Sequence, residues 1–277
     1  MQSAPDETIP PLSSWGTAGP ALVSLSAMYL FVFGDQWTGY FVLVCGLVVA
    51  WMCDFTTLTF GLFRDQLAIA VGIVVLDQIS LRADLSNLGI LSFAVALTAA
   101  VALPYLLLQY AFRDNPITFP WGSWRWNRAQ WAYLGMVVVG GYLILPWYFV
   151  SSGVYRNWPA IHSPEELLRL FIGVNAVGIW DELFFICTVY VLNRRHFRAW
   201  QANLLQAVIF VSFLWELGYQ SWGPVLTIPF ALVQGAIFQL TKNLKYVITV
   251  HLTFDLIVFL VLVHAHNPAW PHPFITG

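Results

Sequence analysis

The chain consists mainly of long apolar stretches that are separated by short polar segments. A helix needs about 20 predominantly apolar residues to cross a hydrocarbon core of about 30 Å. The stretches are continuously apolar and do not alternate with period two, which favours helices over a barrel. We therefore expect an all-α, polytopic integral membrane protein with eight or nine transmembrane helices. The candidate spans are 19–34, 37–53, 66–81, 87–112, 129–150, 166–193, 200–219, 222–241 and 245–265.

The polar segments divide the chain into four parts. An acidic, proline-rich tail precedes the first span, and a polar loop with three tryptophans at 113–128 separates two groups of spans. The second group contains nearly all the candidate chemistry. The expected parts are a polar tail at 1–18, N-terminal transmembrane helices at 19–112, a helical core at 129–265 and a polar tail at 266–277.

Composition and charge support a membrane location and exclude nucleic acid as a partner. Hydrophobic residues make up 59% of the chain and charged residues 9%, where soluble proteins have roughly 25% charged. The net charge of −2 leaves no basic excess to neutralise phosphates. We expect the lipid bilayer itself to be the first partner of this protein.

The distribution of Lys and Arg predicts the orientation in the membrane, because cytoplasmic loops carry the excess. Segments 113–128, 194–199 and 242–245 hold eight Lys and Arg residues, whereas 151–169 holds two and the C-terminal tail none. The basic segments are therefore expected in the cytoplasm and the C-terminus outside. The N-terminus would lie inside with nine spans and outside with eight. A plasma (inner) membrane location is expected.

Four acids lie inside apolar spans of the second group: Asp181, Glu182, Glu216 and Asp255. An ionised carboxylate in hydrocarbon costs several kcal/mol, so such residues face an interior cavity and pair with another group. His251 lies four residues before Asp255 and shares its helix face. A single such acid is often a helix–helix hydrogen-bonding device, but several at overlapping depth, with no Lys or Arg at that depth, indicate a functional cluster.

Other polar residues have simpler explanations. Ser163 and Glu166 have the spacing of an N-terminal capping box, and Asp77 is expected near a helix end. Three histidines are expected in a solvated C-terminal segment outside the membrane. These histidines are His264, His266 and His272.

The acids and the histidine resemble the motifs of the CPBP intramembrane proteases, also called Abi or CaaX-protease-like. The family has a Glu-Glu-x-x-x-Arg helix, a Phe-x-x-x-His helix and a helix with His-x-x-x-Asn or Asp. Asp181 and Glu182 occupy the first motif, 212–216 the second, and His251 with Asp255 the third. The resemblance covers about 165–262 and identifies the chain as a divergent member.

The resemblance implies an intramembrane peptide hydrolase in which a carboxylate and a histidine activate water. Carried over, Asp181 or Glu182 would be the general base, and His251 with Asp255 would polarise the scissile carbonyl. Ile186 stands at the position of the family's arginine, and Glu216 stands at the position of its second-motif histidine. Glu216 would then share a proton with a neighbouring carboxyl group. The expected substrate is a peptide or a membrane protein.

Three alternatives remain open from the residues. Glu182, Glu216, His251 and Asp255 are acceptable ligands for a divalent metal such as Zn²⁺, Mn²⁺ or Fe²⁺. The chain could instead be a non-catalytic membrane binder or scaffold with the same fold, since two of the three motifs depart from the pattern. A transporter would require discontinuous helices and usually a repeat, and the sequence shows neither.

Overall fold

The computed structural model describes residues 14–57, 61–270 and 273–274, and every regular element within these ranges is helical. The expected all-α fold is confirmed for this part of the chain. Most of the predicted N-terminal tail, His272 and the end of the C-terminal tail lie outside the described residues.

The connections between helices are mostly short, apart from 77–86 and 112–127, and several helices change from α to π geometry without a break. The elements are α1 Ser14–Ala27, η1 Met28–Val32, α2 Gln36–Thr57, α3 Leu62–Leu76, α4 Asn87–Leu106, η2 Leu107–Ala111, α5 Arg128–Ser151, η3 Val154–Asn157, α6 Pro164–Asp181, η4 Glu182–Tyr190, α7 Val191–Arg194, α8 Ala199–Leu217, α9 Pro224–Thr241 and α10 Leu244–His266.

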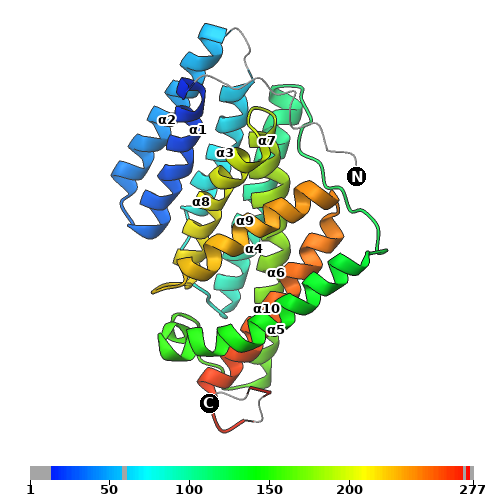
Figure 1. The fold of residues 1–277 in the computed structure, drawn as a ribbon. Coiled ribbons are helices and arrows are strands. Elements are labelled where there is room, and N and C mark those ends of the chain that lie inside the picture. The colour runs from blue at the N-terminus through cyan, green and yellow to red at the C-terminus, as the bar shows by residue number, and fades with distance from the viewer. Residues whose placement is uncertain (1–13, 58–60, 271–272, 275–277) are drawn as a thin grey trace.

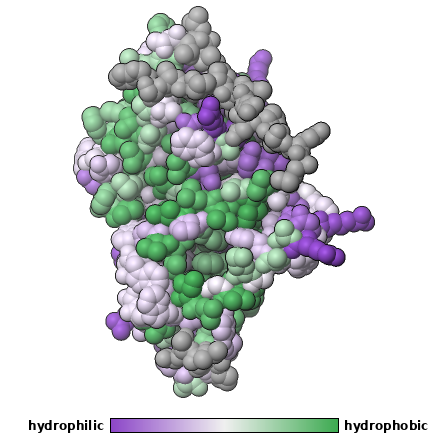
Figure 2. Space-filling model, in the orientation of Figure 1, coloured by the Kyte–Doolittle hydropathy of each residue, from purple (hydrophilic) through white to green (hydrophobic). Residues whose placement is uncertain are grey.

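Six helical segments in the described residues are long and apolar enough to cross a membrane: 36–56, 87–111, 128–151, 164–194, 224–241 and 244–266. The protein is therefore an integral membrane protein. Figure 2 shows hydrophobic residues gathered across the middle of the visible face, with the most hydrophilic ones toward its upper and right edges.

The third predicted span differs from the structure. It was expected at 66–81, whereas α3 begins at Leu62 and ends at Leu76. The pattern missed the first turn because Arg64 and Asp65 are charged, yet Asp65 is completely buried. Asp77 is the C-cap of α3, so its predicted place at a helix end is confirmed.

Helix α10 packs against both α5 and α6 (Figure 1). α9 runs obliquely across the bundle and packs mainly on α8. Figure 1 also shows the short α7 near the top of the bundle and the end of α10 at the bottom. The turn after α7 and the end of α10 therefore lie at opposite ends of the molecule.

A local signal sets the start of α6, whereas α10 continues past the point where its local sequence suggested a loop. The Ser163 side chain accepts a hydrogen bond from the Glu166 backbone, and the Glu166 side chain accepts one from the Ser163 backbone, so the predicted capping box is confirmed. α10 extends through His266, and His264 is buried within it. The prediction of a solvated segment was therefore wrong for His264, because the helix continues where the sequence HAHNP suggested a loop.

Candidate active site

The two acids of the first motif lie at a change of helix geometry. Asp181 is the last residue of α6, and Glu182 is the first residue of the π-helix η4. Both side chains are almost completely inaccessible to solvent. π-Helical turns occur frequently at functional sites.

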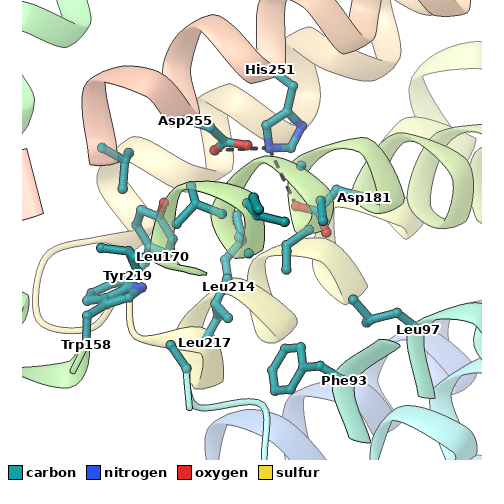
Figure 3. Close-up of a pocket in the computed structure, with 18 of the residues that line it drawn as sticks. Phe93, Leu97, Trp158, Leu170, Asp181, Leu214, Leu217, Tyr219, His251 and Asp255 are labelled. Carbon is teal, nitrogen blue, oxygen red and sulfur yellow. Dashed lines mark ion pairs between the residues drawn. The ribbon is translucent and has the colours of Figure 1, made fainter. Parts of the chain in front are cut away.

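His251, on α10, lies between these two acids and contacts them through different ring nitrogens. Its Nδ1 is 2.7 Å from Glu182 Oε1. Its Nε2 is 3.5 Å from Asp181 Oδ2 and 3.8 Å from Asp255 Oδ1. Figure 3 shows the Asp181 and Asp255 side chains approaching the same side of the imidazole ring. The structure therefore brings these four predicted site residues together.

The carboxyl groups retain unused hydrogen-bonding capacity. Asp181 Oδ1, Glu182 Oε2 and Asp255 Oδ2 are buried and have no hydrogen-bond partner among the described residues. No Lys or Arg forms an ion pair with these three acids in that part of the chain. Three carboxyl groups around one imidazole cannot all ionise cheaply in such surroundings. At least one of them is expected to hold a proton.

A cavity of about 410 Å³ reaches this cluster and is lined by Asp181, His251 and Asp255 but not by Glu182. Its walls are otherwise mainly apolar and come from α4, α6 and the last three helices (Figure 3). Two hydrogen bonds join α6 to α4 and to the segment just before it. Trp180 donates to the Leu97 carbonyl at 2.6 Å, and Arg169 donates to the Leu85 carbonyl at 2.8 Å. The cavity volume is within the range of ordinary ligand pockets.

Small and aromatic residues give the cluster its shape. Gly178 lines the cavity on α6, where a Cβ atom would overlap the Asp255 carboxylate. The Phe230 ring lies 4.9 Å from the imidazole ring, and the Phe210 ring lies 6.1 Å from it. These neighbours restrict the imidazole to one orientation.

A comparison with protein families finds a match in the segment that contains the cluster. Residues 163–257 match the family model described as Type II CAAX prenyl endopeptidase Rce1-like. The resemblance to the CPBP family is confirmed there. No curated protein and no solved structure matches the chain. The matched segment begins at the N-cap of α6 and contains all four clustered residues.

Glu216 is not part of this CPBP-type cluster. Its carboxylate accepts a hydrogen bond from the Leu81 backbone and lies near Asp77 and Arg82 at the connection from α3 to α4. The α8 residue that packs on the imidazole is Phe210. Glu216 follows Phe210 by six residues, which corresponds to about 9 Å along the helix and a rotation to another face. Matching the second motif to 212–216 therefore placed the expected site residue too far along α8.

The predicted four-ligand metal set is consequently not assembled. Glu216 lies elsewhere, and Nδ1 of His251 is already bonded to Glu182. Among the described residues, no group of three or more His, Cys, Asp or Glu side chains is arranged so that it could hold a metal ion.

Sequence reasoning missed one polar side chain of the site, which lies on a different helix. Gln234 on α9 is completely buried, and its Nε2 donates to Glu182 Oε1 at 2.6 Å. The signal was a glutamine inside the otherwise apolar span 222–241. It had no motif to connect it with the acids of α6.

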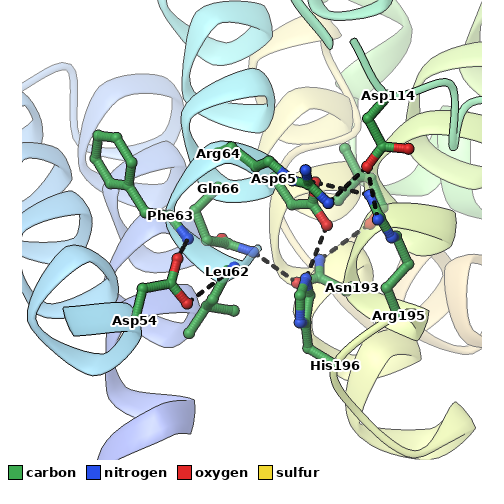
Figure 4. A network of polar contacts seen from close by, with 11 residues as sticks. Asp54, Leu62, Phe63, Arg64, Asp65, Gln66, Asp114, Asn193, Arg195 and His196 are labelled. Carbon is green, nitrogen blue, oxygen red and sulfur yellow. Dashed lines mark hydrogen bonds and ion pairs between the residues drawn. The ribbon is translucent and has the colours of Figure 1, made fainter. Parts of the chain in front are cut away.

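A second group of polar residues around the buried Asp65, here called the Asp65 network, joins α3 to the turn after α7 (Figure 4). Asp65 accepts a hydrogen bond from Arg195 at 3.0 Å and lies 2.7 Å from His196 Nε2. Asp114 contacts Arg64 at 2.6 Å and Arg195 at 2.7 Å. Each of the two acids in this network therefore has an arginine partner.

The pKa of Asp114 shows the effect of these cations. Burial raises the pKa of this carboxyl group. The hydrogen bond from Arg195 and the charges of Arg195 and Arg64 together lower the pKa by a larger amount. The net pKa lies below its ordinary value, so the carboxylate remains ionised at neutral pH.

Proposed function

We propose that this protein is an intramembrane peptide hydrolase of the CPBP type, which uses a carboxylate and histidine cluster in a membrane cavity to activate water. One observation carries the proposal. The buried side chains of Asp181, His251 and Asp255 line one mainly apolar cavity, and not all of their polar atoms have partners among the described residues. Buried ionisable groups of this kind at a cavity are strong candidates for chemistry.

The contacts of the imidazole suggest a role for each residue. An ionised Glu182 can only accept hydrogen bonds, so its contact with Nδ1 favours a proton on that nitrogen. Nε2 is then the basic atom that faces Asp181 and Asp255. We assign Glu182 the orienting role that a buried acid has beside a catalytic histidine. His251 would be the general base, which differs from the role implied by the family motifs.

The proposed reaction balances as follows. Nε2 of His251 takes a proton from water while the water oxygen bonds to the carbonyl carbon of the peptide. Asp181 and Asp255 share one proton, as neighbouring carboxyl groups do, and donate it in a hydrogen bond to the developing oxyanion. The imidazolium then protonates the leaving nitrogen as the carbon–nitrogen bond breaks. The products are a new carboxyl group and a free amine.

The surroundings of the cluster suggest the substrate class and the topology. The mainly apolar walls favour an apolar peptide segment presented within the bilayer, as part of a peptide or membrane-protein substrate. We propose nine spans, with α1–η1, α3 and α8 in addition to the six long apolar segments. The distribution of Lys and Arg would then place the basic turns in the cytoplasm. We also propose an inner-membrane location. The C-terminus would lie outside.

A non-catalytic membrane binder with the same fold is the second candidate. Two positions favour it, since Ile186 replaces the family's arginine and Phe210 offers a hydrocarbon ring where α8 meets the imidazole. Only a measurement of cleavage distinguishes the two functions.

The test compares wild-type protein with His251→Gln in reconstituted vesicles. One probe is a prenylated CAAX-type peptide, the chemistry in the description of the matched family. The other is a membrane-protein extract whose new chain termini are read by mass spectrometry. We expect wild-type protein to generate new termini and His251→Gln to be slower by about 10²–10⁴-fold.

A matched control is His266→Gln, which changes the same residue type near the end of the same helix. His266 contacts the Tyr155 carbonyl and does not line the cavity, so this variant should cleave at the wild-type rate. If wild-type protein generates no new termini, or His251→Gln cleaves equally fast, the hydrolase proposal fails and the binder becomes the working model.

A further inference from the structure

The amide of Gln234 has an orientation that its surroundings fix. Its Nε2 lies 2.6 Å from Glu182 Oε1 and 3.4 Å from the Val247 carbonyl oxygen. Both neighbours are acceptors. The donor end of the amide must therefore point toward them, because the opposite orientation would bring its oxygen against two other oxygens.

Gln234 and His251 bind the same oxygen of Glu182. Oε1 is 2.6 Å from Gln234 Nε2 and 2.7 Å from His251 Nδ1, whereas Oε2 is buried without a partner. Glu182 and Gln234 are both inaccessible to solvent. If a buried carboxylate has few donors and one is removed, a charge-assisted hydrogen bond disappears. Water cannot replace it, because the carboxylate is inaccessible to solvent.

Gln234 donates to Glu182, an acid of the first motif whose expected arginine partner is missing from this chain. The CPBP pattern has an arginine four residues after its second acid, and this chain has Ile186 there, completely buried. Glu182 thus has no cationic partner on its own helix. The amide of Gln234 supplies a donor from α9, a helix that carries none of the family motifs.

We infer that Gln234 is a positioning residue of this site, which holds the Glu182 carboxylate so that His251 keeps its proton on Nδ1 and presents Nε2 to Asp181, Asp255 and the cavity. The inference rests on the proposed function, because it assigns a cause to the state of the proposed base. Gln234 does not line the cavity. It therefore acts through Glu182 and His251 and does not contact the substrate.

The first test is spectroscopic and needs no substrate. Nitrogen-15 shifts of the imidazoles are recorded for histidine-labelled protein in lipid vesicles, and His251 is assigned by difference from His251→Gln. We expect one neutral tautomer, protonated on Nδ1, in the wild type and a mixture of tautomers in Gln234→Leu. Gln206→Leu is the matched control, since Gln206 is equally buried but donates to Asn203 and to the Ala231 carbonyl and not to Glu182.

The second test uses cleavage of the prenylated CAAX-type peptide. Loss of a residue that orients a functional group typically costs about 10–100-fold. We expect Gln234→Leu to lower kcat by about that factor and to leave KM nearly unchanged. The same substitution should have little further effect in a Glu182→Gln background, because two residues that act through one contact are not additive. Gln206→Leu should keep the wild-type kcat.

Gln234→Glu keeps the test valid if Gln234→Leu does not fold. The introduced carboxyl can donate to Glu182 only while it holds a proton, so cleavage should fall as pH rises through its titration. The parallel Gln206→Glu variant should follow the wild-type pH profile.

The outcomes separate the two hypotheses. If Gln234→Leu keeps the wild-type tautomer and Gln234→Glu keeps the wild-type pH profile, the assignment of Gln234 is overturned. If the tautomer changes as expected but wild-type protein cleaves nothing, the assignment stands as a statement about His251 and the hydrolase proposal fails.

Discussion

The cavity cluster and the Asp65 network each combine carboxyl groups with one histidine, and Asp65 is as deeply buried as the acids of the cluster. In the Asp65 network, Arg195 donates to both Asp65 and Asp114 (Figure 4). In the cavity cluster no arginine or lysine of the described residues pairs with the acids, and three carboxyl oxygens have no partner there. Asp65 and the acids of the cavity cluster are therefore alike in burial and differ in whether an arginine compensates their charge.

This difference indicates how to separate structural acids from functional ones. A buried acid whose charge is compensated costs little to keep and joins the elements that provide its partners. A buried acid without a cation is costly, and a sequence that keeps three of them beside a cavity gains something other than stability. The predictions below alter one region while leaving the other intact.

Outside the four clustered residues, the largest effect is expected from Gly178→Ala. The added Cβ would overlap the Asp255 carboxylate and displace it from His251. A displacement of about 1 Å from the reacting position can cost about 10²-fold in rate. Cleavage in vesicles is the measurement.

Gly173→Ala is the control for that prediction. Gly173 lies on the same helix and also lines the cavity, but a Cβ there meets no atom within 4 Å. Equal losses in both variants would show that α6 tolerates no added methyl group, and would remove the argument for Asp255.

In the Asp65 network, Arg195→Leu should reduce stability. The substitution removes the hydrogen bonds to both acids and leaves Asp65 buried with weaker partners. Because Arg195 is partly exposed, the loss should be smaller than the cost of about 3–5 kcal/mol for a fully buried pair, but Asp65 itself is completely buried and loses its shortest arginine contact. Thermal unfolding in detergent should therefore occur at a clearly lower temperature, while the cleavage rate per folded molecule is retained.

Arg125→Leu serves as the control because Arg125 is an exposed basic residue of the loop before α5. Its unfolding temperature should match that of the wild type. If Arg195→Leu is as stable as this control, the Asp65 network does not hold α3 against the turn after α7.

A small effect is expected from Glu216→Gln. The glutamine keeps an oxygen that can accept the hydrogen bond from the Leu81 backbone. We expect cleavage to change by less than about threefold, which corresponds to about 0.7 kcal/mol in the barrier. A loss comparable to that of His251→Gln would return Glu216 to the catalytic group.

The smallest effect is a pH dependence of the Asp114 contacts. The pKa of this carboxyl is lowered in the folded state, so its contribution to stability is present above the unfolded-state pKa of about 3.9 and is lost as pH falls through the lower folded-state value. The difference in unfolding temperature between wild type and Asp114→Asn should therefore shrink below about pH 4. A constant difference at lower pH would contradict this explanation.

The sequence predicted most of the helices because long apolar runs leave few alternatives. The span expected at 245–265 corresponds to Leu244–His266, and that at 87–112 corresponds to 87–111. The pattern failed at α3, where Asp65 is buried by partners more than a hundred residues away. Hydropathy describes a residue by its type and cannot include a distant arginine.

The candidate site was predictable only where the motifs act within one helix. His251 and Asp255 share a face of α10, and Asp181 with Glu182 lie where α6 becomes η4. Gln234 and Gly178 depend on how α9, α10 and α6 pack, which no local pattern encodes. Glu216 was misplaced because a degenerate motif does not specify the register of α8.

We propose that the cavity cluster, whose acids have no arginine or lysine partner among the described residues, performs the chemistry and that the Asp65 network maintains the fold. The most direct measurement compares Asp181→Asn with Asp65→Asn, recording cleavage and thermal unfolding on the same samples. We predict that Asp181→Asn cleaves about 10²–10⁴-fold more slowly and unfolds at or above the wild-type temperature. Asp65→Asn should unfold at a lower temperature and keep its rate per folded molecule. An Asp181→Asn variant that cleaves at the wild-type rate, or an Asp65→Asn variant that is stable but inactive, would contradict the claim.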